Sequence, residues 1–287
     1  MGAPCGCPSS SASQQQLNQL LEAVLAGSKY RHVDKDFILS IGASELRKRR
    51  SLKEAIKATR NKLHQVGGAY QQAVPQYARW LDELRQAAES RSDEREELVR
   101  TACRDIMRHH ASTRERLPEL DRFYNTILSD IAPVHSVIDV ACGLHPLAIP
   151  WMPLAANARY YACDIYQDMM DFLNAGLPYL GVQGEAQVCD VIHACPTQRV
   201  EVAFLLKAIP CLEQLDPLAG RRLLETIHAD HLVVSFPVAS LGGRSKGMLM
   251  NYESHFVDML GDKPWSFERF VFPTELVFLV RKQEHST

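Results

Sequence analysis

The stretch SVIDVACGLHPLAIPWMP, residues 136–153, decides the fold. Its first half is a run of β-branched and apolar residues that holds Asp139 and ends at Gly143. A buried parallel strand that stops at a turn of small residues is how a doubly wound α/β domain forms its ligand-binding edge. A second strand, RYYACDI, reaches Asp164, 21 residues after Gly143. An acid at the tip of a neighbouring strand can accept hydrogen bonds from both hydroxyls of a ribose.

The turn itself holds one glycine, in DVACGLHP. A dinucleotide fingerprint needs three, because the turn, the pyrophosphate and the helix must all approach closely. A ligand without a pyrophosphate does not need the other two. We therefore predict S-adenosylmethionine as the cofactor, with the backbone at Gly143 close to its amino-acid end and Asp164 at its ribose. A plain turn of a Rossmann-like core is the alternative.

Strand and helix patterns alternate after Ala132-Pro133. Strands are predicted over 135–140, 158–164, 184–190, 200–206 and 231–236, with helices near 147–154, 166–176 and 216–229. The segment SFERFVFPTELVFLVRK then predicts two further strands joined by a turn. Five alternating strands followed by a hairpin match the sheet of class I S-adenosylmethionine-dependent methyltransferases. The predicted fold class is therefore α/β, a Rossmann-like seven-stranded sheet with an all-helical N-terminal domain.

The first 130 residues carry only helical periodicity. Helices are predicted from Leu17 to Gly27, from Asp34, after the capping-box pattern Ser51–Glu54, and over 76–90, 93–110 and 113–130. The small and polar residues at the start predict a disordered tail. The expected organisation is a disordered tail over 1–15, a helical RNA-docking domain over 16–110 and a Rossmann-like methyltransferase domain over 111–287.

Composition excludes several classes of protein. No apolar run of the 287 residues is long enough to cross a bilayer, and the N-terminus lacks the pattern of a secretory signal. The eight cysteines are scattered without CxxC pairs, which indicates reduced thiols and the cytoplasm. No set of histidines and cysteines has zinc-like spacing, so we expect no metal.

Charge is concentrated near the N-terminus although the whole chain carries a net charge of −2. Between Lys29 and His64, eleven Lys or Arg residues face four acids, an excess of seven positive charges. Such a concentration is typical of a phosphate-binding surface, and a solvated helical face is the alternative. The candidate RNA-binding residues in this segment are Lys29, Arg47, Arg49, Arg50, Lys53, Lys57 and Arg60.

Three further positions are candidate ligand contacts. Asp190 and Val191 end the third strand, where an acid can receive the exocyclic amine of adenine or can cap a helix. Lys207 follows the fourth strand, where it can contact substrate phosphate or simply end the strand. Arg116 lies near a predicted helix start, an unusual place for a cation, and can grip a carboxylate in bidentate fashion.

Several motifs occur in a fixed order along the chain: HxSTxERLxxLDxFY, DxACGLxPLAxPWM, LLKxxPCLE and SFPxxSLGxRxKGMxxNYxxxF. Together they resemble the aminoglycoside-resistance 16S rRNA methyltransferases that modify N7 of guanine 1405 (rRNA numbering). The resemblance runs from about Ser28 through KLHQVGGAY to TELVFLVRK. One residue departs from the family pattern, because CGLNP is usual and this chain has His145 in place of the asparagine.

The resemblance implies a methyltransferase whose helical domain docks on 16S rRNA in the assembled 30S subunit, acting in the cytoplasm as a monomer. It implies contacts to S-adenosylmethionine from His110, Thr113, Arg116, Ala141, Gly143, Asp164, Ile165, Asp190, Val191 and Lys207. It also implies that Ser235 to Phe256 holds the target nucleotide, with Arg244 and Lys246 on phosphates, Met248 and Tyr252 against a base, and Asn251 at a base edge. A flexible surface loop is the alternative for this segment.

Guanine N7 carries a lone pair and no proton, so its methylation needs no general base. We therefore expect no catalytic residue in the strict sense, and catalysis by placement of the guanine. Two alternatives remain open: a class I methyltransferase for another base or for naked rRNA, and a non-catalytic RNA-binding protein with a vestigial cofactor pocket.

Overall fold

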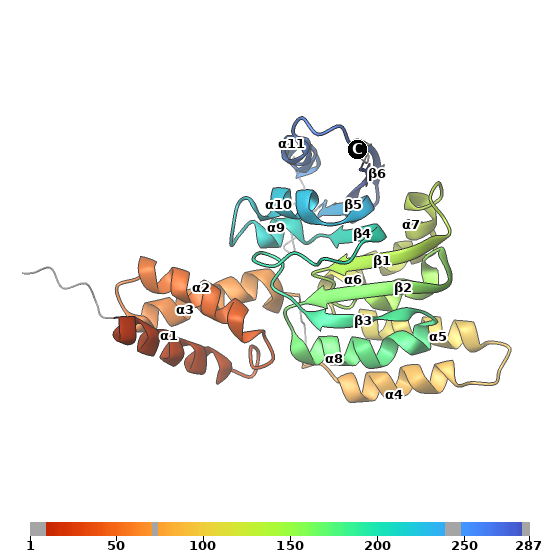
Figure 1. Cartoon of the computed structure of the whole chain (residues 1–287). Coiled ribbons are helices and arrows are strands. Elements are labelled where there is room, and N and C mark those ends of the chain that lie inside the picture. Colours follow the sequence, from red (N-terminus) through yellow and green to blue (C-terminus); the bar gives the residue numbers. More distant parts are fainter. Residues whose placement is uncertain (1–9, 71–73, 239–247, 283–287) are drawn as a thin grey trace, which may run out of the picture. The chain divides into compact units, whose positions relative to one another are not determined.

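A computed structural model describes residues 10–70, 74–238 and 248–282 (Figure 1). Contacts divide the chain into two compact units, Met1–Gly68 and Ala69–Thr287. The boundary therefore lies after Gly68, and the predicted boundary after residue 110 is wrong. The helix over 77–88 packs against residues 167–176, and the helix over 95–107 packs against residues 145–151, all in the second unit. Local periodicity does not reveal which unit a helix joins.

The first unit is entirely helical. Its elements are α1 (Ser10–Leu25), α2 (Lys35–Lys48), α3 (Leu52–Leu63) and the π-helical turn η1 (His64–Gly68). Helix α1 begins at Ser10, inside the predicted tail of residues 1–15. Ser51 caps α3 as the capping-box pattern predicts, its hydroxyl accepting a hydrogen bond from the Glu54 N–H at 3.3 Å. Asp34 caps α2 in the same way through the Phe37 N–H at 2.7 Å.

The second unit begins with further helices. They are α4 (Tyr77–Ala88), α5 (Arg95–Met107), α6 (Ala111–Arg116), the 3₁₀ turn η2 (Leu117–Glu119) and α7 (Leu120–Ile127). The single helix predicted over 113–130 is therefore wrong. Pro118 lies in η2, and proline removes a helix hydrogen bond and clashes with the preceding turn. The break separates α6 from α7 and so changes which end of a helix Arg116 occupies.

A seven-stranded sheet forms the core of the second unit, in the order β3-β2-β1-β4-β5-β7-β6 (Figure 1). Its strands are β1 (Val134–Val140), β2 (Leu154–Asp164), β3 (Gln183–Val188), β4 (Val200–Leu206), β5 (Ala229–Pro237), β6 (Ser266–Val271) and β7 (Glu275–Arg281). Strands β1 to β5 are parallel, while β7 pairs antiparallel with β5 and β6 antiparallel with β7. The predicted strands and the inserted hairpin are confirmed.

The elements between the strands cover the sheet. They are η3 (His145–Trp151), α8 (Gln167–Gly176), η4 (Leu177–Leu180), α9 (Ile209–Leu212), α10 (Ala219–Thr226) and α11 (Met248–Leu260). The segment predicted as a helix near 147–154 is a 3₁₀ helix that contains Pro150. The central strands are buried, as near-continuous apolar runs require in a sheet covered on both faces. Among the described helices, none combines the length and apolarity needed to cross a membrane.

Candidate active site

The turn after β1 and the end of β2 meet at one edge of the sheet. The Gly143 N–H donates to Oδ2 of Asp164 at 2.9 Å, and the Ile165 N–H donates to Oδ1 at 2.7 Å. Ala141 and Gly143 both have left-handed backbones, with φ of 51° and 53°. Each carboxylate oxygen of Asp164 accepts one backbone N–H and so keeps lone pairs for a ligand hydroxyl. The predicted juxtaposition of Gly143 and Asp164 is confirmed.

Burial raises the pKa of Asp164 to about 6, although the N–H groups of Gly143 and Ile165 favour the ionised form. Desolvation disfavours the charge, and the two hydrogen bonds oppose it only in part. The carboxylate is therefore mostly ionised at neutral pH and becomes protonated just below it. This makes Asp164 a titrating group inside the candidate site.

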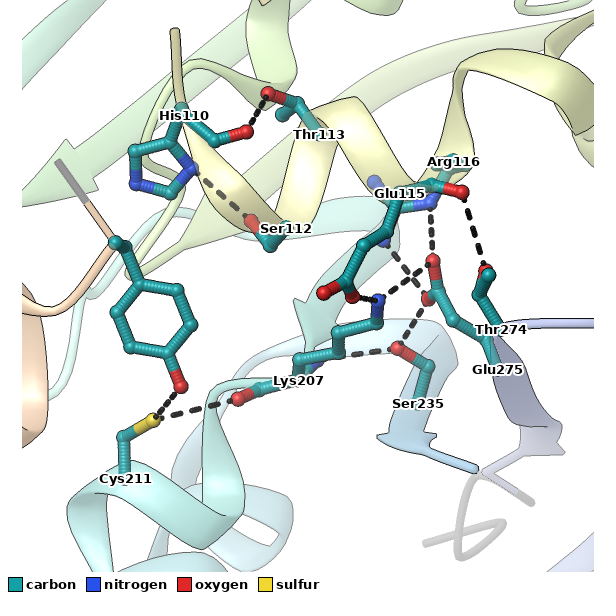
Figure 2. Close-up of polar contacts among 11 residues, drawn as sticks. His110, Ser112, Thr113, Glu115, Arg116, Lys207, Cys211, Ser235, Thr274 and Glu275 are labelled. Atoms are coloured by element: carbon teal, nitrogen blue, oxygen red, sulfur yellow. Dashed lines mark hydrogen bonds and ion pairs between the residues drawn. The ribbon is translucent and has the colours of Figure 1, made fainter. Parts of the chain in front are cut away.

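His110 packs directly against the glycine of this turn. A Cβ added to Gly143 would lie 2.7 Å from Cε1 of His110, so no larger residue fits there without movement. The imidazole stacks on the ring of Tyr70 at 5.8 Å and bonds to the Ser112 hydroxyl at 3.1 Å (Figure 2). Burial lowers the pKa of His110 to about 4, with a smaller contribution from Arg116, so the ring is neutral. Tyr70, whose hydroxyl lies 2.9 Å from Sγ of Cys211, was not among the predicted site residues.

Arg116 forms an ion pair with a residue that the sequence analysis did not identify. Its Nε and Nη2 donate to the two oxygens of Glu275 at 2.7 and 2.8 Å, and both side chains are buried (Figure 2). Glu275 therefore occupies the Nε–Nη2 edge of Arg116, and the expected contact of Arg116 with a ligand carboxylate stays a prediction for the rest of the guanidinium. Arg116 is the last residue of α6, where a cation interacts favourably with the helix dipole. It therefore does not lie at a helix start, the unusual place that the sequence predicted for it. The Thr113 hydroxyl is also engaged, donating to the carbonyls of Met107 and His110.

Lys207 joins the same cluster from the end of β4. Its Nζ donates to Glu115 at 2.6 Å and lies 3.6 Å from Glu275, and its φ of 58° is left-handed (Figure 2). The Ser235 hydroxyl donates to Glu275 at 2.8 Å. We call Arg116, Glu275, Lys207 and Glu115 the Glu275 ion cluster. The reading of Lys207 as the exposed end of a strand is wrong, since the side chain is buried and paired.

The charges of the Glu275 ion cluster stabilise one another. Burial alone opposes ionisation of Glu275, but Arg116 and Lys207 still hold its pKa below the ordinary value. Arg116, Lys207 and Glu275 are thus buried together, with Glu115 partly exposed beside them, and removing a single buried partner leaves an uncompensated charge. Glu275 and Glu115 were missed by the sequence analysis because no spacing signal joins residues so far apart along the chain.

Asp190 and Val191 follow β3 at the same edge. The Asp190 oxygens accept from the Ile192 N–H at 3.0 Å and pair with Nδ1 of His193 at 2.6 Å. This is an Asx turn, and because residues 191–193 form a turn rather than a helix, the alternative of a helix cap is wrong, while the ligand contact stays a prediction. Val191 is buried against the core. The Cys189 N–H donates to the Asp164 carbonyl at 3.0 Å, so the ends of β2 and β3 lie side by side.

Part of the predicted target segment lies outside the described residues, including Arg244 and Lys246. Met248, Asn251 and Tyr252 lie on α11, where Asn251 is exposed. The ring of Tyr252 stacks on Phe236, at the end of β5, with centroids 5.0 Å apart. One face of Tyr252 is therefore covered by the core of the protein.

The basic residues of the first unit differ in their surroundings. A groove of about 510 Å³ is lined by Lys48, Arg49, Arg50, Glu54, Lys57, Ala58 and Asn61. Lys29 lies outside it and bonds to His64 at 3.1 Å, and Arg60 donates to the Ala23 carbonyl at 2.5 Å. Arg49 is paired in part with Glu45 at 3.0 Å. Four of the seven groove residues are cationic, so the groove suits a phosphate chain. No group of three potential metal ligands is found among residues 10–70, 74–238 and 248–282.

The sheet order and the acid beside the glycine turn define a Rossmann-like methyltransferase fold. The chain belongs to a particular family of this class, because the model of the ribosomal RNA methyltransferase family FmrO matches residues 26–279. A 16S rRNA (guanine(1405)-N(7))-methyltransferase of Micromonospora rosea is 34% identical over 95% of this chain and 99% of its own length. The predicted family and the predicted enzyme class are confirmed.

Two solved structures are similar over almost the whole chain. The 16S rRNA methyltransferase RmtF, in complex with S-adenosyl-L-homocysteine, has a TM-score of 0.80 and 29% identity, covering 97% of this chain and 100% of its own. The 16S rRNA methylase RmtB has a TM-score of 0.73 and 28% identity, covering 93% of this chain and 98% of its own. The helical N-terminal region and the predicted fold class thus agree with those of solved methyltransferases.

Proposed function

We propose that this protein transfers a methyl group from S-adenosylmethionine to N7 of guanine 1405 of 16S rRNA, as the name of its Micromonospora relative describes. Its substrate is the assembled 30S subunit, and the modification confers aminoglycoside resistance. The observation that carries the proposal is the Gly143–Asp164 contact at the carboxyl edge of a methyltransferase sheet, in a chain that matches the family over residues 26–279.

The residues at this edge fit S-adenosylmethionine. Asp164 keeps acceptor lone pairs for the two ribose hydroxyls, and Gly143 offers a backbone without a side chain. Ile165 and Val191 supply apolar surface for the adenine. The cofactor supplies an electrophilic methyl group on a sulfonium. Because the bidentate face of Arg116 is taken, we assign the cofactor's amino-acid end to the neighbourhood of His110, Thr113, Ala141 and Gly143 rather than to that face.

The protein contributes placement rather than proton transfer. Guanine N7 has no proton to lose, and the Glu275 carboxylate already accepts from Arg116 and Ser235 and faces Lys207. Glu275 is therefore unsuited to act as a base. Asn251 on α11 is exposed and can form hydrogen bonds with a base edge. The ring of Tyr252 is held in place by stacking on Phe236. The work of the site is to hold N7 in line with the methyl group and to exclude water.

Docking on the small subunit is assigned to the basic groove of the first unit. Side chains cannot reach N7 readily in the deep major groove of A-form RNA, so the guanine must leave its helix. Turning it out costs a few kcal/mol, which is of the size that phosphate contacts can offset. Arg244 and Lys246, outside the described residues, are proposed to bind phosphates beside the target. Such a substrate implies a cytoplasmic protein, and we propose that it acts as a monomer.

The test uses purified full-length protein with 30S subunits and with free 16S rRNA. We expect methyl transfer to 30S subunits, with N7-methylguanine mapped to position 1405 by aniline cleavage and reverse transcription. A sensitive bacterium expressing the protein should resist gentamicin and kanamycin and remain sensitive to apramycin. Modification of another base would contradict the proposed target. Cofactor binding without turnover on any rRNA would favour the non-catalytic alternative.

A further inference from the structure

His145 is buried beneath the cofactor turn, and the mechanism proposed above does not use it. It is the first residue of η3 and is 2% exposed. Its Nδ1 lies 2.6 Å from Oδ2 of Asp139, and its Nε2 lies 2.9 Å from the Tyr124 hydroxyl. The Tyr160 hydroxyl donates to the same oxygen of Asp139 at 2.9 Å. The imidazole thus bridges β1 and α7.

The direction of these hydrogen bonds follows from the donors available. The Asp139 carboxylate accepts from the Tyr160 hydroxyl and can only accept from Nδ1 of His145. The Tyr124 proton then points to Nε2 of His145, and the guanidinium of Arg116, which can only donate, faces the Tyr124 oxygen. Nε2 carries a lone pair, so Nδ1 carries the proton and donates to Asp139. A single directed series of hydrogen-bonding side chains thus runs from Arg116 through Tyr124 and His145 to Asp139.

The two ends of this series lie at different parts of the site. Asp139 belongs to β1, which leads straight into the Gly143 turn. Arg116 belongs to the Glu275 ion cluster, which also holds Lys207 at the end of β4. Every member from Arg116 to Asp139 is almost fully buried, so water does not readily replace a lost partner. The backbone turn itself is closed separately by the His145 N–H and the Cys142 carbonyl at 3.0 Å.

We propose that His145 is a positioning residue, which through Tyr124 fixes the orientation of Arg116 and the Glu275 ion cluster relative to the cofactor turn. An imidazole suits this task because its two nitrogens reach Asp139 and Tyr124 at once. An asparagine amide takes the place of Nδ1 and reaches only Asp139. A glutamine amide extends to the place of Nε2 and reaches only Tyr124. This inference rests on the methyl-transfer function proposed above.

The two amides therefore separate the two contacts. We expect His145→Asn to bind S-adenosylmethionine within about twofold of the wild type, while kcat on 30S subunits falls about tenfold, the effect of about one hydrogen bond. His145→Gln should show the reverse, with cofactor Kd raised about tenfold and kcat within about threefold. Calorimetry and single-turnover methylation measure the two quantities. Proportional losses of both in both variants, or losses that follow Tm alone, would overturn the proposal.

Tyr124→Phe provides the double-mutant cycle. Because Tyr124→Phe and His145→Asn break the same link, the double variant should lose no more kcat than either single variant. Tyr160→Phe is the matched control, since it removes a hydroxyl from Asp139 and leaves the link intact, and its kcat should stay within about twofold. If the factors by which the two single variants lower kcat multiply in the double variant, the two residues act independently, contrary to the proposal.

A readout that does not depend on activity separates this inference from the proposed function. In ¹⁵N-histidine-labelled protein, long-range ¹H–¹⁵N correlation should show the Nδ1–H tautomer for the resonance that disappears in His145→Asn. A proton on Nε2 would overturn the directed series even in an active enzyme. A wild-type protein that methylates no rRNA would instead refute the proposed function, while the tautomer and the contrast in cofactor affinity would still test the role of His145.

Discussion

Arg116 and Glu275 are 159 residues apart in the chain and meet in a buried bidentate ion pair at 2.7 and 2.8 Å. The pair joins α6 to the first residue of β7, and Lys207 attaches the end of β4 to it. A helix and two non-adjacent strands thus depend on one carboxylate. These buried charges connect the helix and the two strands in a place where water does not readily compete.

Replacing Glu275 by Gln should weaken the fold strongly. The variant leaves Arg116 and Lys207 without a compensating anion apart from Glu115, so we expect the free energy of unfolding to fall by about 3 kcal/mol. Urea unfolding followed by circular dichroism measures the change. The control is Glu268→Gln, on exposed β6, which pairs with Arg281 at 2.7 Å. It should cost less than about 0.5 kcal/mol. Equal effects in the two variants would mean that the cluster does not stabilise the fold.

Cofactor binding should depend on pH through Asp164. Its pKa in the folded protein is raised from 3.8 to about 6, and only the ionised carboxylate can accept from both ribose hydroxyls. Between pH 3.8 and about pH 6, the unfolded chain ionises Asp164 more readily than the folded protein does, so the free energy of unfolding falls as pH rises. Cofactor affinity rises over the same pH range because the carboxylate becomes ionised. We expect Kd for S-adenosylmethionine to level off above about pH 7 and to rise about tenfold per pH unit well below pH 6. Calorimetry from pH 5 to 8 measures it.

The same titration has an internal control. Asp164→Asn should bind the cofactor more weakly at pH 7.5 and should lose the change in affinity near pH 6. Binding at pH 6 should also release a proton, which appears as a dependence of the binding enthalpy on the buffer. A wild-type affinity that is constant from pH 5 to 8 would remove Asp164 from the ribose contact.

Gly143→Ala should damage the cofactor site by two routes. The position has φ of +53°, and the added Cβ would lie 2.7 Å from Cε1 of His110. The backbone strain costs about 1 kcal/mol, and His110 must move away from the turn. We expect cofactor affinity to fall at least about tenfold. The control is Gly181→Ala, with φ of +79° and no neighbouring atom within 4 Å. It should lower Tm similarly and leave the cofactor Kd unchanged, and a similar loss of affinity there would point to general destabilisation.

Removing Arg49, Lys53 and Lys57 together should weaken binding to 30S subunits. If each contacts a phosphate, the slope of log affinity against log salt should become shallower by about 2 to 3. Cofactor affinity should not change. The control removes three exposed cations of the second unit, Arg79, Arg85 and Arg91, and so gives the same net charge. Fluorescence-based binding at several salt concentrations measures both. Equal losses in the two triple variants would indicate a general charge effect rather than docking by the first unit.

The predicted strands of the second unit follow from local information. Runs such as those in β4 and β5 are buried on both faces, and the turn at Gly143 is set by small residues that tolerate a left-handed backbone. The approach of Asp164 to Gly143 followed because neighbouring parallel strands end at the same edge. Ser51 capped its helix as its spacing with Glu54 predicted. In each case the deciding interaction lies within one element or between adjacent strands.

Two features that the sequence did not supply depend on packing between distant segments. The sequence could supply Arg116 but not its partner, because only the insertion of β7 beside β5 brings Glu275 to α6. The boundary after Gly68 likewise depends on which surface α4 and α5 cover.

The sequence by itself thus determined the strands, the turn at Gly143 and the family, because these follow from periodicity, turn chemistry and the order of motifs. Only the tertiary structure decided which buried charges and hydrogen-bonding groups pair, such as His145 with Asp139 and Tyr124. The physical reason is that a buried polar group must find a partner, and that partner is chosen by the packing of the whole fold.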